Sequence, residues 1–80
     1  IGTINKIIVH PREVFAEAIK NHAVFLILLH NHPSGDPQPS KEDKSFTEEI
    51  RKAGMLLGIP LIDHIIIGHN SYYSFYDNEW

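Results

Sequence analysis

The stretch AVFLILLHNHPSGDPQPSKED, residues 23–43, decides the fold of this chain. Residues 23–30 are continuously apolar apart from the last, which is typical of a central strand covered on both faces. Prolines and a glycine exclude regular structure over residues 33–39, and Ser40 then begins a helix. A loop therefore leaves the carboxyl end of a strand and enters a helix, where open α/β sheets usually place their ligands.

The flanking segments extend this pattern into an α/β (α+β) fold with the order β-α-β-α-β-β. We expect strands at 3–10, 61–68 and 72–76, and helices that begin at Pro11 and Ser40. Gly58 and Pro60 end the second helix. The predicted buried residues are Val14, Phe15, Ala18 and Ile19 on the first helix and Phe46, Ile50, Ala53 and Leu57 on the second. Right-handed crossovers would give parallel strands, and an antiparallel hairpin would complete a mixed sheet with helices packed against it.

Composition limits the classes of function. The 80 residues are 42% hydrophobic, which suits one domain over residues 1–80. A net charge of −3 argues against an extended basic surface for nucleic acid. The chain has no cysteine, so thiolate zinc sites are excluded and a cytoplasmic location is expected. The longest apolar run, residues 23–29, is too short to span a bilayer, so no membrane partner is expected.

His30 and His32 are two residues apart at a strand end, so their side chains point to the same side. Asp43 falls in the first turn of the next helix, and the loop can bring it back beside them. Two histidines, a carboxylate and a water form a four-coordinate catalytic zinc site. Two alternatives stay open: Ser40 and Asp43 also have the spacing of a helix capping box, and the loop can be structural without any metal.

These residues resemble a known signature. HNHPSGDPQPSKED matches the H-x-H-P-x₆-S-x₂-D pattern of JAB/MPN (JAMM) metalloprotease-like domains. Together with PREVF and DHIIIG, it is similar to the RadC-like branch of that superfamily, from about residue 2 to residue 75. The resemblance implies a cytidine-deaminase-like/JAB architecture, with His30, His32 and Asp43 as Zn²⁺ ligands. It also implies that Ser40 helps to hold the oxyanion during hydrolysis of an amide or isopeptide bond in a peptide or protein substrate.

The chain departs from the family pattern at the general base, a glutamate that normally lies well upstream of the histidines. Glu13 and Glu17 are the only upstream candidates, and both fall on the first helix. Glu42 adjoins Asp43 but faces elsewhere on its helix. We assign none of them, and we expect a fragment that lacks the base and the first strands of the domain.

Three further expectations follow from the residues. The family's DNA-repair label gives an alternative function, a non-catalytic interaction module associated with DNA-processing machinery. His64, which interrupts an apolar strand beside Asp63, either braces the metal site or is satisfied by the backbone or its neighbouring acid. A sheet that lacks strands exposes an edge, so we expect the chain to form homodimers through it.

Overall fold

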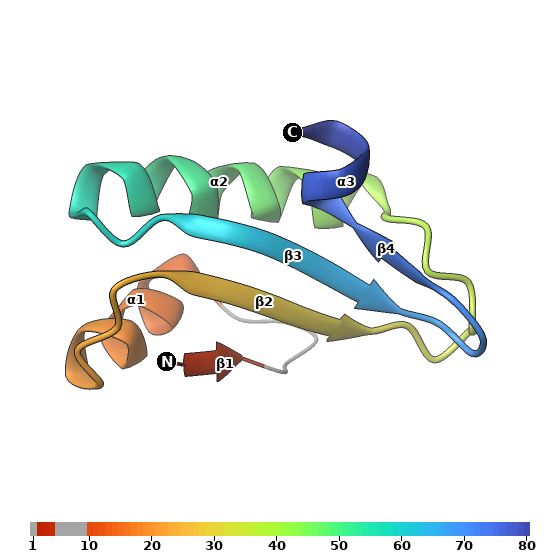
Figure 1. Cartoon of the computed structure of the whole chain (residues 1–80), viewed down its shortest axis with the longest axis horizontal. Coiled ribbons are helices and arrows are strands. Elements are labelled where there is room, and N and C mark those ends of the chain that lie inside the picture. The colour runs from red at the N-terminus through yellow and green to blue at the C-terminus, as the bar shows by residue number, and fades with distance from the viewer. Residues whose placement is uncertain (1, 5–9) are drawn as a thin grey trace.

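A computed structural model describes residues 2–4 and 10–80 of the chain. The predicted order is confirmed and extended by one short helix: β1 (Gly2–Ile4), α1 (Pro11–Lys20), β2 (Leu26–Asn31), α2 (Lys41–Leu57), β3 (Leu61–Ile67), β4 (Tyr72–Ser74) and α3 (Phe75–Glu79) (Figure 1). Residues 5–9 of the first predicted strand lie outside the described residues. No helix within 2–4 and 10–80 combines the length and apolar character needed to cross a membrane.

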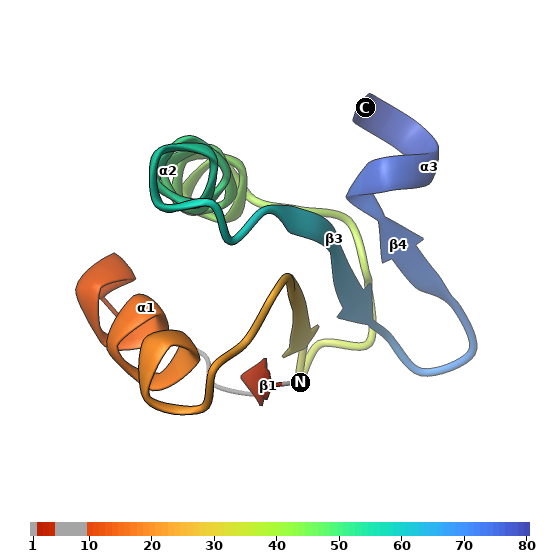
Figure 2. The same cartoon turned by 60° about the vertical axis from the view of Figure 1, so that its left-hand side comes forward.

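The sheet has the strand order β1-β2-β3-β4, with β1, β2 and β3 parallel and β4 antiparallel to β3. The β1-α1-β2 and β2-α2-β3 connections both lead to the next strand on the same side of the sheet. When such connections share the usual right-handedness, their helices lie on the same face of the sheet. Accordingly, α1 and α2 lie side by side on one face (Figure 2). The mixed α/β fold predicted from the sequence is thus confirmed.

The core lies between this face and the two helices. Its buried members are Val14, Phe15, Ala18, Leu26, Leu28, Ile50, Ile59 and Leu61. The side chains of β2 alternate, so Leu26 and Leu28 are buried under the helices while Ile27 and Leu29 on the other face are only partly buried. The predicted central position of this strand is confirmed, but among the described residues the helices cover only one of its faces.

Both long helices begin at capping boxes. His10 caps α1: its side chain accepts the backbone N–H of Arg12, and Glu13 accepts the backbone N–H of His10. Ser40 caps α2 in the same way with Asp43. These contacts satisfy N–H groups that have no partner inside the helix. They fix where each helix starts and, for α2, where Asp43 points.

The buried stripes of the helices are narrower than predicted. Ile19 is 56% exposed and Leu57 51% exposed, because both lie in the last helical turn, beyond the buried stripe. On α2 the fully buried positions are Thr47, Ile50 and Gly54, with Phe46 and Ala53 packed partly against the core. Gly58 ends α2 with φ of 72°, as its sequence position predicted.

The predicted strand 72–76 ends early, and α3 begins at Phe75. The side chain of Ser74 accepts the N–H of Asp77, and the carboxylate of Asp63 accepts the N–H of Tyr76. Asp63 lies on β3, eleven residues before Ser74, so a long-range contact redirects the chain into a helix. The strand prediction for Phe75 and Tyr76 was wrong for this reason.

Candidate metal centre

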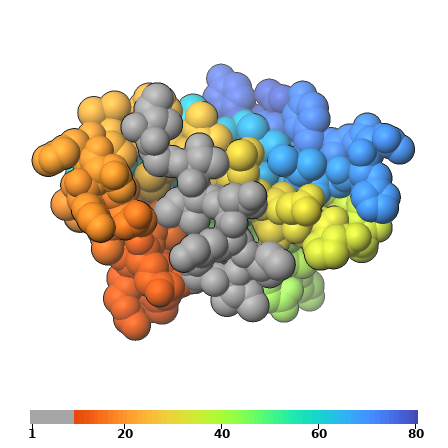
Figure 3. Space-filling view, turned by 90° about the horizontal axis from the view of Figure 1, so that it is seen from below, coloured from red at the N-terminus to blue at the C-terminus, as the bar shows by residue number. Residues whose placement is uncertain are grey.

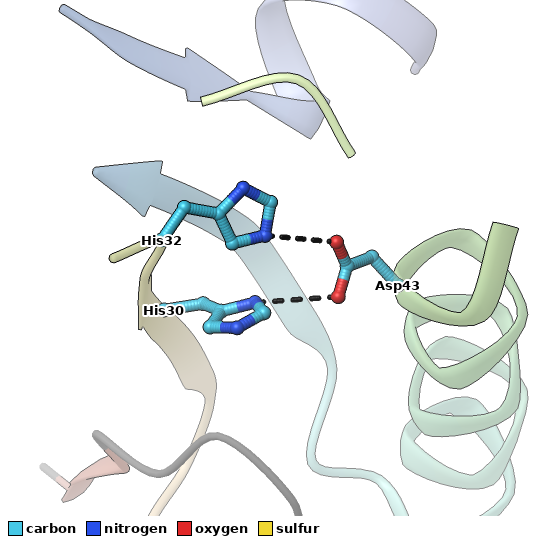
Figure 4. A group of neighbouring side chains, drawn as sticks. All are labelled: His30, His32 and Asp43. Atoms are coloured by element: carbon cyan, nitrogen blue, oxygen red, sulfur yellow. Dashed lines mark hydrogen bonds and ion pairs between the residues drawn. The ribbon is translucent and has the colours of Figure 1, made fainter. Parts of the chain in front are cut away.

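His30, His32 and Asp43 converge at the carboxyl end of β2 (Figure 4). His30 lies on β2, His32 follows the strand, and Asp43 lies in the first turn of α2. Nδ1 of His30 is 3.4 Å from one carboxylate oxygen of Asp43, and Nε2 of His32 is 3.1 Å from the other. The loop therefore brings together the three residues that the sequence singled out.

The orientation of His32 is fixed by its second ring nitrogen. Nδ1 of His32 lies 2.8 Å from the backbone carbonyl oxygen of Asp36. A carbonyl oxygen can only accept, so Nδ1 must carry the proton and donate it. In the neutral ring, Nε2 then presents a lone pair to the carboxylate of Asp43. Two acceptors at 3.1 Å repel one another unless a proton or a cation lies between them.

Asp43 is both a capping residue and a member of the cluster. Its Oδ2 accepts the backbone N–H of Ser40 at 2.9 Å, and its own N–H donates to Oγ of Ser40 at 3.0 Å. The two roles that the sequence left as alternatives are compatible. The capping box holds the carboxylate in a direction that also faces both histidines.

The surroundings of His30 and Asp43 favour the protonation states in which these side chains can bind a cation. Burial is the largest effect on His30 and lowers its pKa, helped by the neighbouring His32 charge and opposed by Asp43. Burial alone would raise the pKa of Asp43, but hydrogen bonds from Ser40 and the two histidine charges lower it overall. At neutral pH, His30 is therefore neutral and Asp43 ionised, which are the states that ligate metals.

The donor set fits a divalent ion. One ligand atom from each residue lies within 4.8 Å of the other two. Tetrahedral ligands at zinc distances are about 3.4 Å apart, close to the two nitrogen–oxygen separations in the cluster. Imidazole nitrogen and carboxylate oxygen suit zinc and several other first-row metals, so the cluster does not by itself select the ion.

Two residues behind the cluster were not predicted as a unit. Thr47, one turn after Asp43 on α2, is buried, and its Oγ1 lies 2.6 Å from the carbonyl oxygen of Asp43 and 2.6 Å from Nδ1 of His64. Among the described residues, Thr47 is the partner of Nδ1 of His64, while Asp63 accepts the backbone N–H of His64. A polar residue at position 47, in register with Ile50 and Gly54 on the buried stripe, was the signal in the sequence.

The turn between β3 and β4 supports the loop that carries His32. The N–H of His69 donates to the carbonyl of Gly35, and the N–H of His32 donates to the carbonyl of Ile67. A Cβ on Gly68 would collide with the carbonyl oxygen of Gly35, so only glycine allows this approach. The two segments lie together at the end of the molecule away from α1 (Figure 3).

The glutamates considered for general base stay outside the cluster formed by the described residues. Glu13 caps α1 through its carboxylate. Glu17 and Glu42 are exposed, Glu42 on α2 beside Asp43.

The fold and the cluster define a small α/β domain with a candidate metal centre at the carboxyl end of a central strand. A sequence model described as the RadC-like JAB domain matches residues 1–80, and the chain belongs to this family. A UPF0758 protein of Clostridium botulinum (strain Loch Maree / Type A3) is 61% identical over 74 residues, 92% of this chain and 32% of that protein. A UPF0758 protein of Clostridium novyi (strain NT) is 54% identical with the same coverage. The chain thus spans about a third of the length of these relatives.

Proposed function

We propose that this domain is a zinc-dependent hydrolase of amide or isopeptide bonds. The observation that carries the proposal is the position of His32: its Nε2 lies 3.1 Å from the carboxylate of Asp43, and its opposite ring nitrogen lies 2.8 Å from the carbonyl of Asp36. That arrangement suits a bound cation. His30, His32 and Asp43 would hold the zinc ion, which would supply polarisation of a carbonyl and activation of water.

The chain's own residues would orient the reaction. Ser40 caps α2 beside the cluster, and its hydroxyl would turn to donate to charge that develops on a substrate oxygen. Asp36 fixes the ring of His32 through its carbonyl, as partners of ligating histidines commonly do. A peptide or protein is the substrate class, and a cytoplasmic location forms part of this proposal.

Metal titration of the 80-residue chain tests the proposal. We expect one equivalent of Zn²⁺ to bind by calorimetry, and Asp43→Asn and His32→Ala to weaken that binding by at least about tenfold. Glu42→Gln is the matched control for Asp43→Asn, because it removes the same charge from the adjacent, exposed position. The control should bind zinc as the unmodified chain does.

Absence of stoichiometric binding, or equal affinity for Asp43→Asn and Glu42→Gln, would remove the metal centre from the proposal. Binding of DNA by the purified chain would instead favour the alternative, a non-catalytic module associated with DNA-processing machinery. That binding should weaken steeply with salt.

A further inference from the structure

His64 is a buried histidine for which the proposed hydrolysis has no direct use. Its side chain lies on β3, and the residue is 3% exposed. The hydroxyl proton of Thr47 goes to the carbonyl oxygen of Asp43, because that oxygen can only accept. Nδ1 of His64, 2.6 Å from the same hydroxyl oxygen, must therefore be the donor. A directed chain of hydrogen bonds runs from β3 through α2 to the backbone of Asp43.

The ring of His64 also faces His30, the member of the cluster that lies on β2. It lies nearly parallel to the ring of His30, with centroids 6.0 Å apart and an interplanar angle of 19°. It stacks on Phe75 at 5.0 Å and 7°. His64 of β3 thus lies beside the ring of His30 on β2 and reaches Asp43 of α2 through a single hydroxyl.

A threonine hydroxyl often bonds to the carbonyl four residues before it, and that contact alone carries no function. Here the hydroxyl receives a second bond from a buried ring, which fixes its rotamer and the direction of its proton. The bonded carbonyl belongs to Asp43, the residue that also completes the capping box of α2. The contact therefore acts on the residue whose direction decides whether the cluster is formed.

We propose that Thr47 and His64 are a pair of positioning residues that hold Asp43 and His30 at the spacing needed to bind a metal. This inference rests on the proposed metal function and deepens it. Neither residue would contact the ion. Their effect would be to keep the donor atoms from β2 and α2 in register before a metal arrives, so that little ordering remains when it binds.

Cobalt(II) titration followed by visible absorption tests the pair, because the absorption of Co²⁺ reports the geometry of its ligands. Thr47→Val keeps the shape of the side chain and removes the hydroxyl. We expect it to weaken Co²⁺ affinity about 10–100-fold and to change the absorption bands, as loss of such outer partners commonly does. Thr47→Ser restores the hydroxyl and should recover most of the affinity and the original bands. Ser45→Ala, at an exposed position of α2, is the control and should change neither.

The outcomes separate this inference from the proposed function. If the unmodified chain binds no Co²⁺, the metal function itself fails. If it binds Co²⁺ and a folded Thr47→Val variant keeps the same affinity and bands, only the positioning role is overturned. An equal loss in Thr47→Ser and Thr47→Val would assign the effect to packing of the methyl group and would also overturn it.

A measurement on the unmodified chain covers the case in which Thr47→Val does not fold. Nitrogen-15 NMR of the histidine rings should show His64 with its proton on Nδ1, in both the metal-free and the Co²⁺- or Zn²⁺-treated chain. A proton on Nε2 would break the directed chain from His64 to Asp43 and overturn the inference.

Discussion

At the scale of single residues, the buried ring of His64 makes stability depend on pH. Burial is the main cause that lowers the pKa of His64 to about 4, and the neighbouring His30 charge adds to it. In the unfolded chain the same group titrates near its ordinary value of 6.5. As pH falls below that value, His64 binds a proton in the unfolded chain but stays neutral in the folded protein. The contribution of His64 to the free energy of unfolding is thus fully present above pH 6.5 and is lost as pH falls towards 4.

We expect the metal-free chain to lose about 2 kcal/mol of unfolding free energy between about pH 7.5 and about pH 5. Urea denaturation in the presence of a chelator measures it. The slope should be smaller in His64→Gln and preserved in His22→Asn, which removes an exposed histidine and suits the positive φ of 55° at that position. An equal dependence of unfolding free energy on pH in all three proteins would contradict the assignment to His64. Some dependence should remain in His64→Gln, because the pKa of His30 is also lowered by burial.

The sequence predicted the cluster better than its supports, for a physical reason. His30 and His32 share a side through strand geometry, and Asp43 is placed by a helix start, so local rules locate all three. Thr47 meets His64, 17 residues further along the chain, only after α2 packs against the sheet. No local spacing in the sequence encodes such contacts. A polar residue on the buried stripe of a helix, such as Thr47, nevertheless indicates that a polar partner lies opposite it.

At the scale of elements, glycines in two segments allow a matched test of the loop that carries His32. Gly68→Ala would push a methyl group into the carbonyl oxygen of Gly35 and displace the loop. We expect a loss of about 2–3 kcal/mol in unfolding free energy and weaker zinc binding. Gly58→Ala meets nothing within 4 Å but occupies a φ of 72°, so it should cost about 1 kcal/mol and leave zinc affinity unchanged. Equal zinc affinities for the two variants would show that the β3–β4 turn does not position His32.

The ends of the elements were harder to predict than the elements themselves. Periodicity located α1, β2, α2 and β3, because each buries one face or stripe against the others. It failed at Phe75, where a capping serine and the distant Asp63 stop β4 and begin α3. It also failed at Ile19 and Leu57, whose apolar side chains continue the helical pattern into turns that the core no longer covers.

At the scale of the whole molecule, the described sheet ends in β1 on one side and β4 on the other. Edge strands offer unpaired backbone groups to a second chain. The molecule also exposes large apolar side chains where α2 ends, including Leu56 at 88%. Both features favour self-association, and they predict different responses to substitution.

We expect the 80-residue chain to dimerise through its sheet edge, and sedimentation velocity over a wide range of concentrations measures this. Leu56→Glu places a charge on the exposed end of α2 and leaves the sheet edges intact, so edge pairing should survive it. Loss of the dimer in Leu56→Glu would show that the two chains associate through the apolar end of α2 and not through the sheet edge. A monomer at every concentration would contradict both, because neither the backbone edge nor the apolar end would then offset the entropy of association.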